Sequence, residues 1–390
     1  MPPEIGKGVG AVVRHRAVRV LWGAAALALV AGCSSGGETG PPVGTPSPTA
    51  SSPASSAASP PASSAAPAVR VAGTLTEDLE SPWGLAALPG GDLLVSSRDE
   101  RTITRVDGRT GGKTRVGEVP GVVPRGEGGL MGLAWRDGWV YAYLTAESDN
   151  RIVRMRYGNG GGGGDRLGPP QVILSGIPKG VVHNGGRIAF GPDGMLYAGT
   201  GERGETGLAQ SVESLGGKIL RMTPEGKPAP GNPFPGSVVY SYGHRNVQGL
   251  AWDGDGRLWA AEFGQNTWDE LNLIRPGANY GWPKAEGRAG VSDLVDPVAQ
   301  WRTSEASPSG IAYAGGAIWM AGLRGERLWR VPLSGAERSG DPEAFLVEEH
   351  GRLRTVLAAG DGRLWLTTSE TDTRGTPGAG DDKILRLEVR

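Results

Sequence analysis

The chain has 390 residues, with 40 lysine and arginine residues against 41 aspartate and glutamate residues, so its net charge is close to zero. A chain without a basic excess argues against a nucleic-acid partner. Glycine is abundant (67 residues) and 12 tryptophans are present; many glycines between short apolar runs are typical of turn-rich, all-β structure. The single cysteine excludes an internal disulfide framework.

The N-terminus has the pattern of a secretory signal. Three arginines precede an apolar run over residues 20–31, which is too short to span a bilayer. Small residues then lead to Cys33, where a bacterial lipoprotein signal carries its acylated thiol. We therefore expect residues 1–33 to be a lipoprotein signal peptide, with Cys33 lipidated and the protein anchored to the bacterial cell membrane outside the cytoplasm. The alternative is an ordinary signal peptide with a chance cysteine.

Residues 34–68 consist almost entirely of Ser, Pro, Ala, Gly and Thr, with Glu38 as their one charge. Such a segment cannot bury enough apolar surface to offset its ordering entropy. We expect a disordered tether between the anchor and a single domain over residues 69–390.

Within residues 69–390, three short patterns recur six times in a fixed order. An apolar stretch is followed by a glycine turn with a second strand, and then by a strand of alternating character. The glycines that open the second pattern lie 46 to 62 residues apart: Gly91, Gly138, Gly194, Gly256, Gly316 and Gly362. A repeat of this length predicts radial four-stranded blades, hence an all-β, six-bladed β-propeller. A β-sandwich would not repeat an ordered triplet six times.

Two segments, residues 181–190 and 242–250, differ from the repeat background. Each lies just before an apolar stretch that we expect to form an inner strand, which would place His183 and Arg245 at the mouth of the channel. The glycines after the histidine would let the backbone approach a ligand closely. From the residues alone, two alternatives stay open: His183 caps a turn, and Arg245 pairs with a carboxylate.

At these segments the chain resembles a known family, the soluble sugar dehydrogenases that use pyrroloquinoline quinone (PQQ). Within their glucose/sorbosone group it is most similar to the bacterial aldose dehydrogenases. The resemblance covers residues 69–390. The stretches that carry it most specifically are His183-Asn184-Gly185-Gly186-Arg187, residues 243–250, Asn279-Tyr280-Gly281-Trp282-Pro283 and Arg352-Leu353-Arg354.

The resemblance implies PQQ- and calcium-dependent oxidation of an aldose at its anomeric carbon to a lactone. His183 would be the general base that removes the proton of the anomeric hydroxyl, and hydride would pass to the quinone. Arg245 would lie at the quinone oxygen, where negative charge develops, and Asn246 would be a second donor to the cofactor. The electrons would go on to an acceptor that the sequence does not identify.

PQQ carries three carboxylates and needs cations around it. Arg352 and Arg354 are two residues apart on a strand-like stretch, so their side chains share one face, and they match the paired arginines of the family. The alternative is two exposed charges on a strand. The resemblance further assigns Arg324, Trp301, Thr303 and Thr368 to the cofactor, although Trp301 equally suits a place in the core.

For calcium, the resemblance implies one ion that bridges the quinone and the backbone carbonyls of Gly264 and Gln265. A second, structural ion would use the Glu270 side chain and the Tyr280 carbonyl. Hard cations prefer such oxygen ligands. Taken alone, the pair Asp269-Glu270 would more often lie in a solvated turn.

Two positions depart from the family pattern. The glucose-specific members carry an aspartate before the base, where this chain has Val182, and the loss of that charged neighbour should slow proton removal. A glutamine that commonly contacts cofactor and sugar is matched by Glu127. Its carboxylate would repel an anionic quinone unless it were protonated or paired with Arg125 or calcium.

These departures keep a second function open, a cofactor-less propeller that binds carbohydrate or a partner protein. The retained arginines argue against it, because sugar binding alone needs no clamp for carboxylates. A third possibility, a calcium-dependent lactonase, would need several acidic side chains that converge on a metal, and no such cluster surrounds His183 in the sequence.

Overall fold

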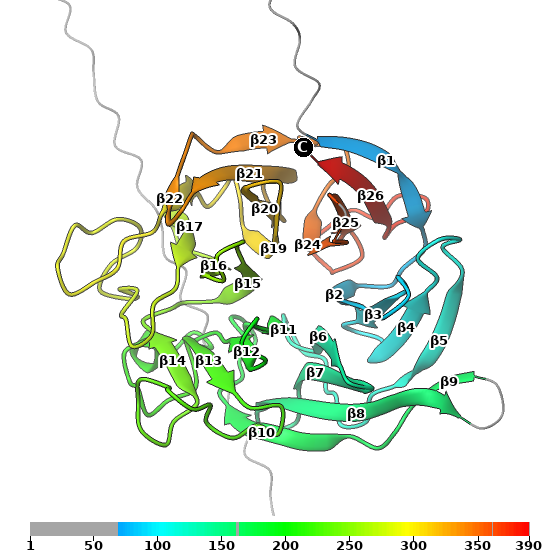
Figure 1. Ribbon diagram of the computed structural model, residues 1–390, viewed down its shortest axis with the longest axis horizontal. Coiled ribbons are helices and arrows are strands. Elements are labelled where there is room, and N and C mark those ends of the chain that lie inside the picture. Colours follow the sequence, from blue (N-terminus) through cyan, green and yellow to red (C-terminus); the bar gives the residue numbers. More distant parts are fainter. Residues whose placement is uncertain (1–68, 161–163, 361, 390) are drawn as a thin grey trace, which may run out of the picture. The chain divides into compact units, whose positions relative to one another are not determined.

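The computed structural model describes residues 69–160, 164–360 and 362–389. They form six antiparallel sheets arranged as blades in a ring (Figure 1), so the prediction of a six-bladed β-propeller is confirmed. Among these described residues the only helix is a short 3₁₀ turn, Thr206–Ala209, and none is long and apolar enough to cross a membrane. The expected signal peptide, Cys33 and the tether lie outside the described residues.

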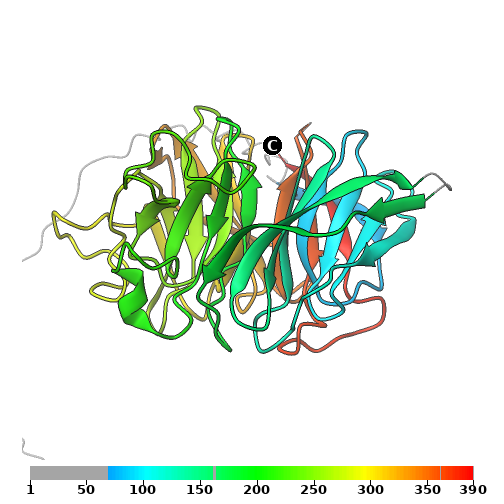
Figure 2. The same ribbon diagram turned by 90° about the horizontal axis from the view of Figure 1, so that it is seen from below.

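Each blade runs outward from the channel in the strand order of its sheet, and the side view in Figure 2 shows the blades standing around the axis. Blade 1 contains β2 (Pro82–Ala87), β3 (Leu93–Ser97), β4 (Thr102–Val106) and β5 (Lys113–Glu118). Blade 2 contains β6 (Leu130–Arg136), β7 (Trp139–Thr145), β8 (Asn150–Gly160), β9 (Gly164–Leu167) and β10 (Gln171–Ile177). Blade 3 contains β11 (Ile188–Phe190), β12 (Leu196–Gly199), β13 (Lys218–Met222) and β14 (Val239–Tyr242).

The other three blades complete the ring. Blade 4 contains β15 (Val247–Trp252), β16 (Leu258–Glu262), β17 (Trp268–Leu273) and β18 (Ala299–Arg302). Blade 5 contains β19 (Pro308–Ala314), β20 (Ala317–Gly322), β21 (Arg327–Ser334), β22 (Glu337–Arg338) and β23 (Glu343–Phe345). Blade 6 contains β24 (Leu353–Ala358), β25 (Arg363–Thr368), β26 (Ile384–Val389) and, as its outer strand, β1 (Val69–Thr76).

The three recurring sequence patterns correspond to the three inner strands of every blade. The ring closes through β1, whose register on β26 runs from Val69 opposite Val389 to Thr76 opposite Ile384. The first and last strands of the propeller therefore share one sheet, a pairing that the repeat pattern did not reveal.

Glycines in the inner strands allow neighbouring blades to approach closely. A Cβ atom at Gly84 would lie 2.6 Å from the Met131 carbonyl oxygen, and one at Gly249 would lie 2.5 Å from the Ser309 carbonyl oxygen. Both neighbours belong to the inner strand of the next blade. Further out, apolar side chains of adjacent blades pack together, as Leu94 of blade 1 does with a cluster of blade 2. The core of the domain is thus formed between blades, which explains why one blade alone would not fold.

Candidate active site

A cavity of about 570 Å³ lies where the inner strands begin. Two kinds of segment line it: the connections that enter an inner strand from the preceding blade, and the loops that follow the second strand of a blade. Antiparallel pairing brings these two kinds of segment to the same end of the ring. Ten of the predicted site residues line this cavity: Glu127, His183, Arg245, Asn246, Gly264, Gln265, Thr303, Arg324, Arg352 and Arg354.

His183 lies in the connection that enters β11, with a left-handed φ of +54°. Asn184 fixes this connection, because its side chain exchanges hydrogen bonds of 2.9 and 3.0 Å with the backbone of Gly180. The following glycines allow the connection to pack closely against neighbouring strands. A Cβ at Gly185 would lie 2.5 Å from the Gly199 carbonyl oxygen, and one at Gly186 would lie 2.8 Å from the Met131 sulfur.

The imidazole of His183 has a carboxylate partner that the sequence did not reveal. Its Nδ1 lies 2.6 Å from Oε1 of Glu202, a side chain that is 1% exposed. Glu202 follows β12, the strand that pairs with β11, and its Oε2 is buried without a hydrogen-bond partner. Val182 stands where the glucose-specific members carry an aspartate, and Glu202 is a charged neighbour of His183 that the sequence did not indicate. Because a carboxylate can only accept a hydrogen bond, Nδ1–H donates to Glu202 and Nε2 is the ring nitrogen that can accept a proton.

Arg245 lies in the connection that enters β15 and makes no ion pair among the contacts of the described residues. Its backbone N–H donates to Glu262 Oε2 at 2.9 Å, its Nη1 donates to the Phe263 carbonyl at 3.3 Å, and its guanidinium lies over the Trp282 ring. Burial lowers the pKa of Arg245. Four nearby carboxylates raise this pKa but do not outweigh burial: Glu202, Glu286, Asp269 and Glu127. Its Nε is buried without an acceptor. The residue lines the cavity without a carboxylate partner, so its guanidinium is suited to an incoming anionic oxygen.

Asn246 is 2% exposed, and its Oδ1 accepts the backbone N–H of Gly185 at 2.9 Å. The side-chain NH₂ group is therefore the part of the amide that is left to donate into the cavity. This contact also joins the connections that carry His183 and Arg245, so the two predicted catalytic residues are held by a common amide.

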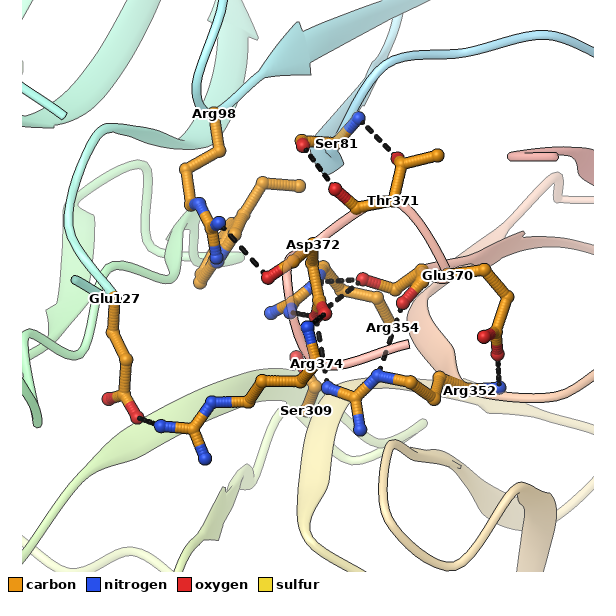
Figure 3. A network of polar contacts seen from close by, with 12 residues as sticks. Ser81, Arg98, Glu127, Ser309, Arg352, Arg354, Glu370, Thr371, Asp372 and Arg374 are labelled. Atoms are coloured by element: carbon orange, nitrogen blue, oxygen red, sulfur yellow. Dashed lines mark hydrogen bonds and ion pairs between the residues drawn. The ribbon is translucent and has the colours of Figure 1, made fainter. Parts of the chain in front are cut away.

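Asp372 connects three arginines that line the cavity, Arg98, Arg352 and Arg354, which we call the arginine wall (Figure 3). Its Oδ2 accepts Nη2 of Arg352 at 2.9 Å and Nη2 of Arg354 at 2.6 Å, and its carbonyl accepts Nη2 of Arg98 at 3.2 Å. Burial alone would raise the pKa of Asp372, but Arg354 and Arg352 outweigh it and hold that pKa well below the usual range. Burial lowers the pKa of Arg354 to about 10. The structure therefore places Arg352 and Arg354 in a shared network and not as two exposed charges on a strand.

Glu127 is paired with Arg374 and not with Arg125, the protein partner that the sequence suggested. Its Oε1 accepts Nη2 of Arg374 at 2.8 Å (Figure 3). Its Oε2 accepts the backbone N–H of His183 at 2.9 Å. Arg125 makes a backbone contact with Gly128 instead. The carboxylate is thus compensated by a guanidinium of blade 6, and it helps to hold the loop of His183.

The predicted calcium positions lie in two places. Gly264 and Gln265 line the main cavity. Glu270 and Tyr280 line a much smaller one of about 10 Å³, which is close to the size of one water molecule. Burial and the charge of Glu262 raise the pKa of Glu270 to about 8, so a bound cation would relieve a buried carboxylate. Within the described ranges no group of three or more His, Cys, Asp or Glu could hold a metal, so backbone carbonyls would have to contribute.

Two predicted cofactor residues lie outside the main cavity. Trp301 is 4% exposed and packs 5.6 Å from the ring of Trp329 in the core. It belongs to β18, the outermost strand of blade 4, and this position keeps it away from the channel. Thr368 lines a neighbouring cavity and is 1% exposed; its hydroxyl donates to Asp382 and accepts the Lys383 N–H, each at 2.8 Å.

The residues that sequence reasoning missed share one location. Arg98, Glu202, Asp372 and Arg374 all follow the second strand of a blade and lie near or in the cavity. A polar residue just after the second strand, in each repeat, is a signal that could have found them. Three of the predicted residues, Gly264, Gln265 and Arg324, also follow a second strand, so this position contributes to the cavity in several blades.

Comparisons with known proteins agree with this geometry. Residues 79–377 match the family Glucose / Sorbosone dehydrogenase. A PQQ-bound aldose sugar dehydrogenase from Streptomyces coelicolor is 68% identical, with a TM-score of 0.81 over 84% of this chain and 100% of that one. A glucose dehydrogenase-type oxidoreductase from Thermus thermophilus is 45% identical, with a TM-score of 0.74 over 82% of this chain and 99% of that one.

The aldose sugar dehydrogenase of Escherichia coli K12 is 26% identical over 78% of this chain and 91% of its own length. The resemblance expected from the motifs is thereby confirmed. The chain belongs to the glucose / sorbosone dehydrogenase family of oxidoreductases.

Proposed function

We propose that this protein oxidises aldose sugars at the anomeric carbon to lactones, with PQQ and calcium as cofactors and His183 as the general base. The observation that carries the proposal is a single cavity with the His183 imidazole on one wall and Arg245, Arg324, Arg352 and Arg354 around it. The similarity to the PQQ-bound enzyme of Streptomyces coelicolor supports the same function.

His183 performs the proton step in this proposal. Glu202 holds the ring through Nδ1, so Nε2 accepts the proton of the anomeric hydroxyl. As the imidazole becomes positively charged, the buried Glu202 carboxylate stabilises it. PQQ, when bound, supplies an electrophilic carbonyl that accepts hydride from the sugar.

The arginines hold the cofactor in this proposal. Arg352 and Arg354 are kept in place by Asp372 and present donors to carboxylates, and Arg324 lines the same cavity. Arg245 is suited to stabilise negative charge at the quinone oxygen, because it lines the cavity and makes no ion pair among the described residues. Asn246 adds the free NH₂ group of its amide.

The calcium positions fit oxygen ligation. Gly264 and Gln265 would contribute backbone carbonyls to an ion in the main cavity, and Glu270 with the Tyr280 carbonyl would hold a structural ion. Calcium would supply positive charge near the reacting carbonyl.

The alternative of a cofactor-less binding propeller loses its main support. Glu127 motivated it, yet its charge is compensated by Arg374, and Glu202 supplies the carboxylate that Val182 does not. A lactonase would need acidic groups free to converge on a metal. The acidic residues lining the cavity, Glu127, Asp269 and Asp372, are instead bound to an arginine or to backbone amides.

We further propose that Cys33 is lipidated and holds the enzyme at the outer face of the bacterial membrane, where it passes electrons to a membrane-side acceptor. The sequence pattern of residues 14–33 supports this location. Labelling with a lipid precursor tests it: label should enter the wild-type chain and be absent from Cys33→Ser.

Reconstitution tests the enzymatic proposal. The purified chain is loaded with PQQ and calcium, and reduction of an electron-accepting dye is followed with a panel of aldoses. His183→Ala should lose turnover while its PQQ affinity stays close to that of the wild type. No turnover with any aldose, together with no cofactor absorbance on the protein, would refute the proposal.

A further inference from the structure

The loop after β16 wraps around one carboxylate oxygen. The backbone N–H groups of Gln265, Asn266, Thr267 and Trp268 donate to Oε1 of Glu286 at 2.8, 2.9, 2.7 and 3.0 Å. Asp269 Oδ1 accepts the preceding N–H, that of Gly264, at 2.9 Å. Five consecutive amides are thus fixed by two carboxylates.

Peptide geometry determines where the carbonyls of this loop point. In a trans peptide unit, the C=O of one residue and the N–H of the next lie on opposite sides. The N–H groups of Gln265 and Asn266 point at Glu286, so the carbonyls of Gly264 and Gln265 point away from it. Glu286 lines the small cavity, Gln265 lines the main one, and Gly264 lies between them and lines both. The carbonyls therefore lie on the side of the main cavity.

Gly264 is needed for this arrangement. A Cβ at this position would overlap the Trp268 carbonyl oxygen and lie 2.7 Å from Glu286 Oε1. The loop is therefore closed tightly around the carboxylate, and a side chain at residue 264 would push it off Glu286.

We propose that Glu286 is a positioning residue for calcium, which holds the carbonyls of Gly264 and Gln265 toward the main cavity so that they can receive the ion. This inference rests on the proposed function, because that function places a calcium ion at these carbonyls. Glu286 itself would not touch the ion that it positions.

The test compares Glu286→Ala with Glu286→Gln. The glutamine keeps one carbonyl oxygen that can accept the same N–H groups, whereas the alanine leaves them without an acceptor. PQQ is titrated into the chain by its visible absorbance, once with EDTA and once with saturating calcium, and the ratio of the two Kd values reports the calcium-dependent gain. Glu337→Ala, on the exposed strand β22, is the matched control.

We expect the ratio of the two Kd values to be about 10-fold or more smaller in Glu286→Ala than in the wild type, as for outer-shell partners of metal ligands. In Glu286→Gln and in the control the ratio should stay close to that of the wild type. The thermal midpoint in EDTA separates this effect from misfolding. An unchanged ratio in Glu286→Ala, or an equal loss in both variants, would overturn the inference alone. A wild-type chain that binds no PQQ would overturn the proposed function, and this inference with it.

Discussion

His183 and Glu202 meet at 2.6 Å between Nδ1 and Oε1, although they lie on different segments of blade 3. His183 precedes β11 and Glu202 follows β12, and the antiparallel pairing of these strands brings the two segments together. The carboxylate orients the imidazole and determines which nitrogen faces the cavity. Its charge also acts on Arg245: burial lowers the pKa of that residue, and the carboxylate partly offsets this effect.

Replacing Glu202 tests this relationship. Glu202→Gln keeps the shape of the side chain but removes the charge that stabilises the protonated imidazole. We expect kcat to fall about 10²–10⁴-fold, the range of general-base contributions, with PQQ affinity changed little because Glu202 is not part of the arginine wall. Glu205→Gln, on the exposed surface beside it, is the control. A Glu202→Gln enzyme with wild-type kcat would show that His183 acts without this partner.

The repeat pattern predicted the fold because it depends on local chemistry. An apolar inner strand and the glycine turn that follows it can be recognised over a short stretch of sequence. Six copies of this pattern predict six blades, which bury their faces by closing into a ring. The closure through β1 could not be predicted this way, because Val69 and Val389 pair across the whole length of the domain.

The sequence predicted only those cavity residues that belong to recognisable motifs. His183, Arg245 and Arg354 lie in distinctive stretches, whereas Glu202 and Asp372 lie in loops whose sequence is ordinary. Their importance arises from the three-dimensional contacts they make. Trp301 was predicted to contact the cofactor but lies on an outer strand. The sequence alone does not distinguish a tryptophan in that position from one beside the channel.

The arginine wall should control cofactor affinity. Arg354 is 4% exposed and its Nη2 binds Asp372 at 2.6 Å. Arg354→Ala removes a charged donor, and hydrogen bonds to charged groups are worth about 1.5–3 kcal/mol, so we expect the Kd for PQQ to rise about 10-fold or more. Arg70→Ala, whose partner Glu388 lies on the surface, should leave it unchanged. The Kd is measured by absorbance titration, and equal values for both variants would contradict the role of Arg354.

Glu127→Gln restores the residue that the family resemblance favours at this position. The amide oxygen can still accept the His183 N–H, so the base should stay in place. Only the ion pair with Arg374 is lost, and because Arg374 is well exposed this pair is worth at most about 1 kcal/mol. We expect a small change in the free energy of unfolding, measured by denaturant titration, and PQQ affinity equal to or better than that of the wild type. A marked loss of affinity would show that the carboxylate itself contributes to the site.

Asp372 should make stability depend on acid pH. Its folded-state pKa lies below the unfolded value of about 3.9, so the unfolded chain binds more protons as the pH falls below about 4. The stabilisation is present in full at neutral pH and is lost as the pH falls toward the folded-state pKa. We expect Asp372→Asn to be destabilised by about 3–5 kcal/mol at pH 7, since breaking a buried pair leaves arginines uncompensated. The difference in stability between Asp372→Asn and the wild type, followed by thermal unfolding, should become smaller from pH 4 to pH 3. A gap that stays constant over this range would show that Asp372 does not act through its charge.

Ring closure should depend on β1. A chain that begins at Glu77 lacks the strand that completes blade 6, whereas a chain that begins at Val69 keeps it. The shorter chain loses the hydrogen bonds between β1 and β26. It also lacks Val69 and Leu75, each of which is 6% exposed in the folded domain, so the apolar surface that they cover becomes exposed. Burial of such a side chain is worth about 1.5–3 kcal/mol, and the free edge of β26 would promote association between chains. We expect a lower thermal midpoint and aggregation on light scattering for the chain that begins at Glu77. Equal midpoints for the two chains would mean that blade 6 is stable without its outer strand, and that the ring does not need β1 to stay closed.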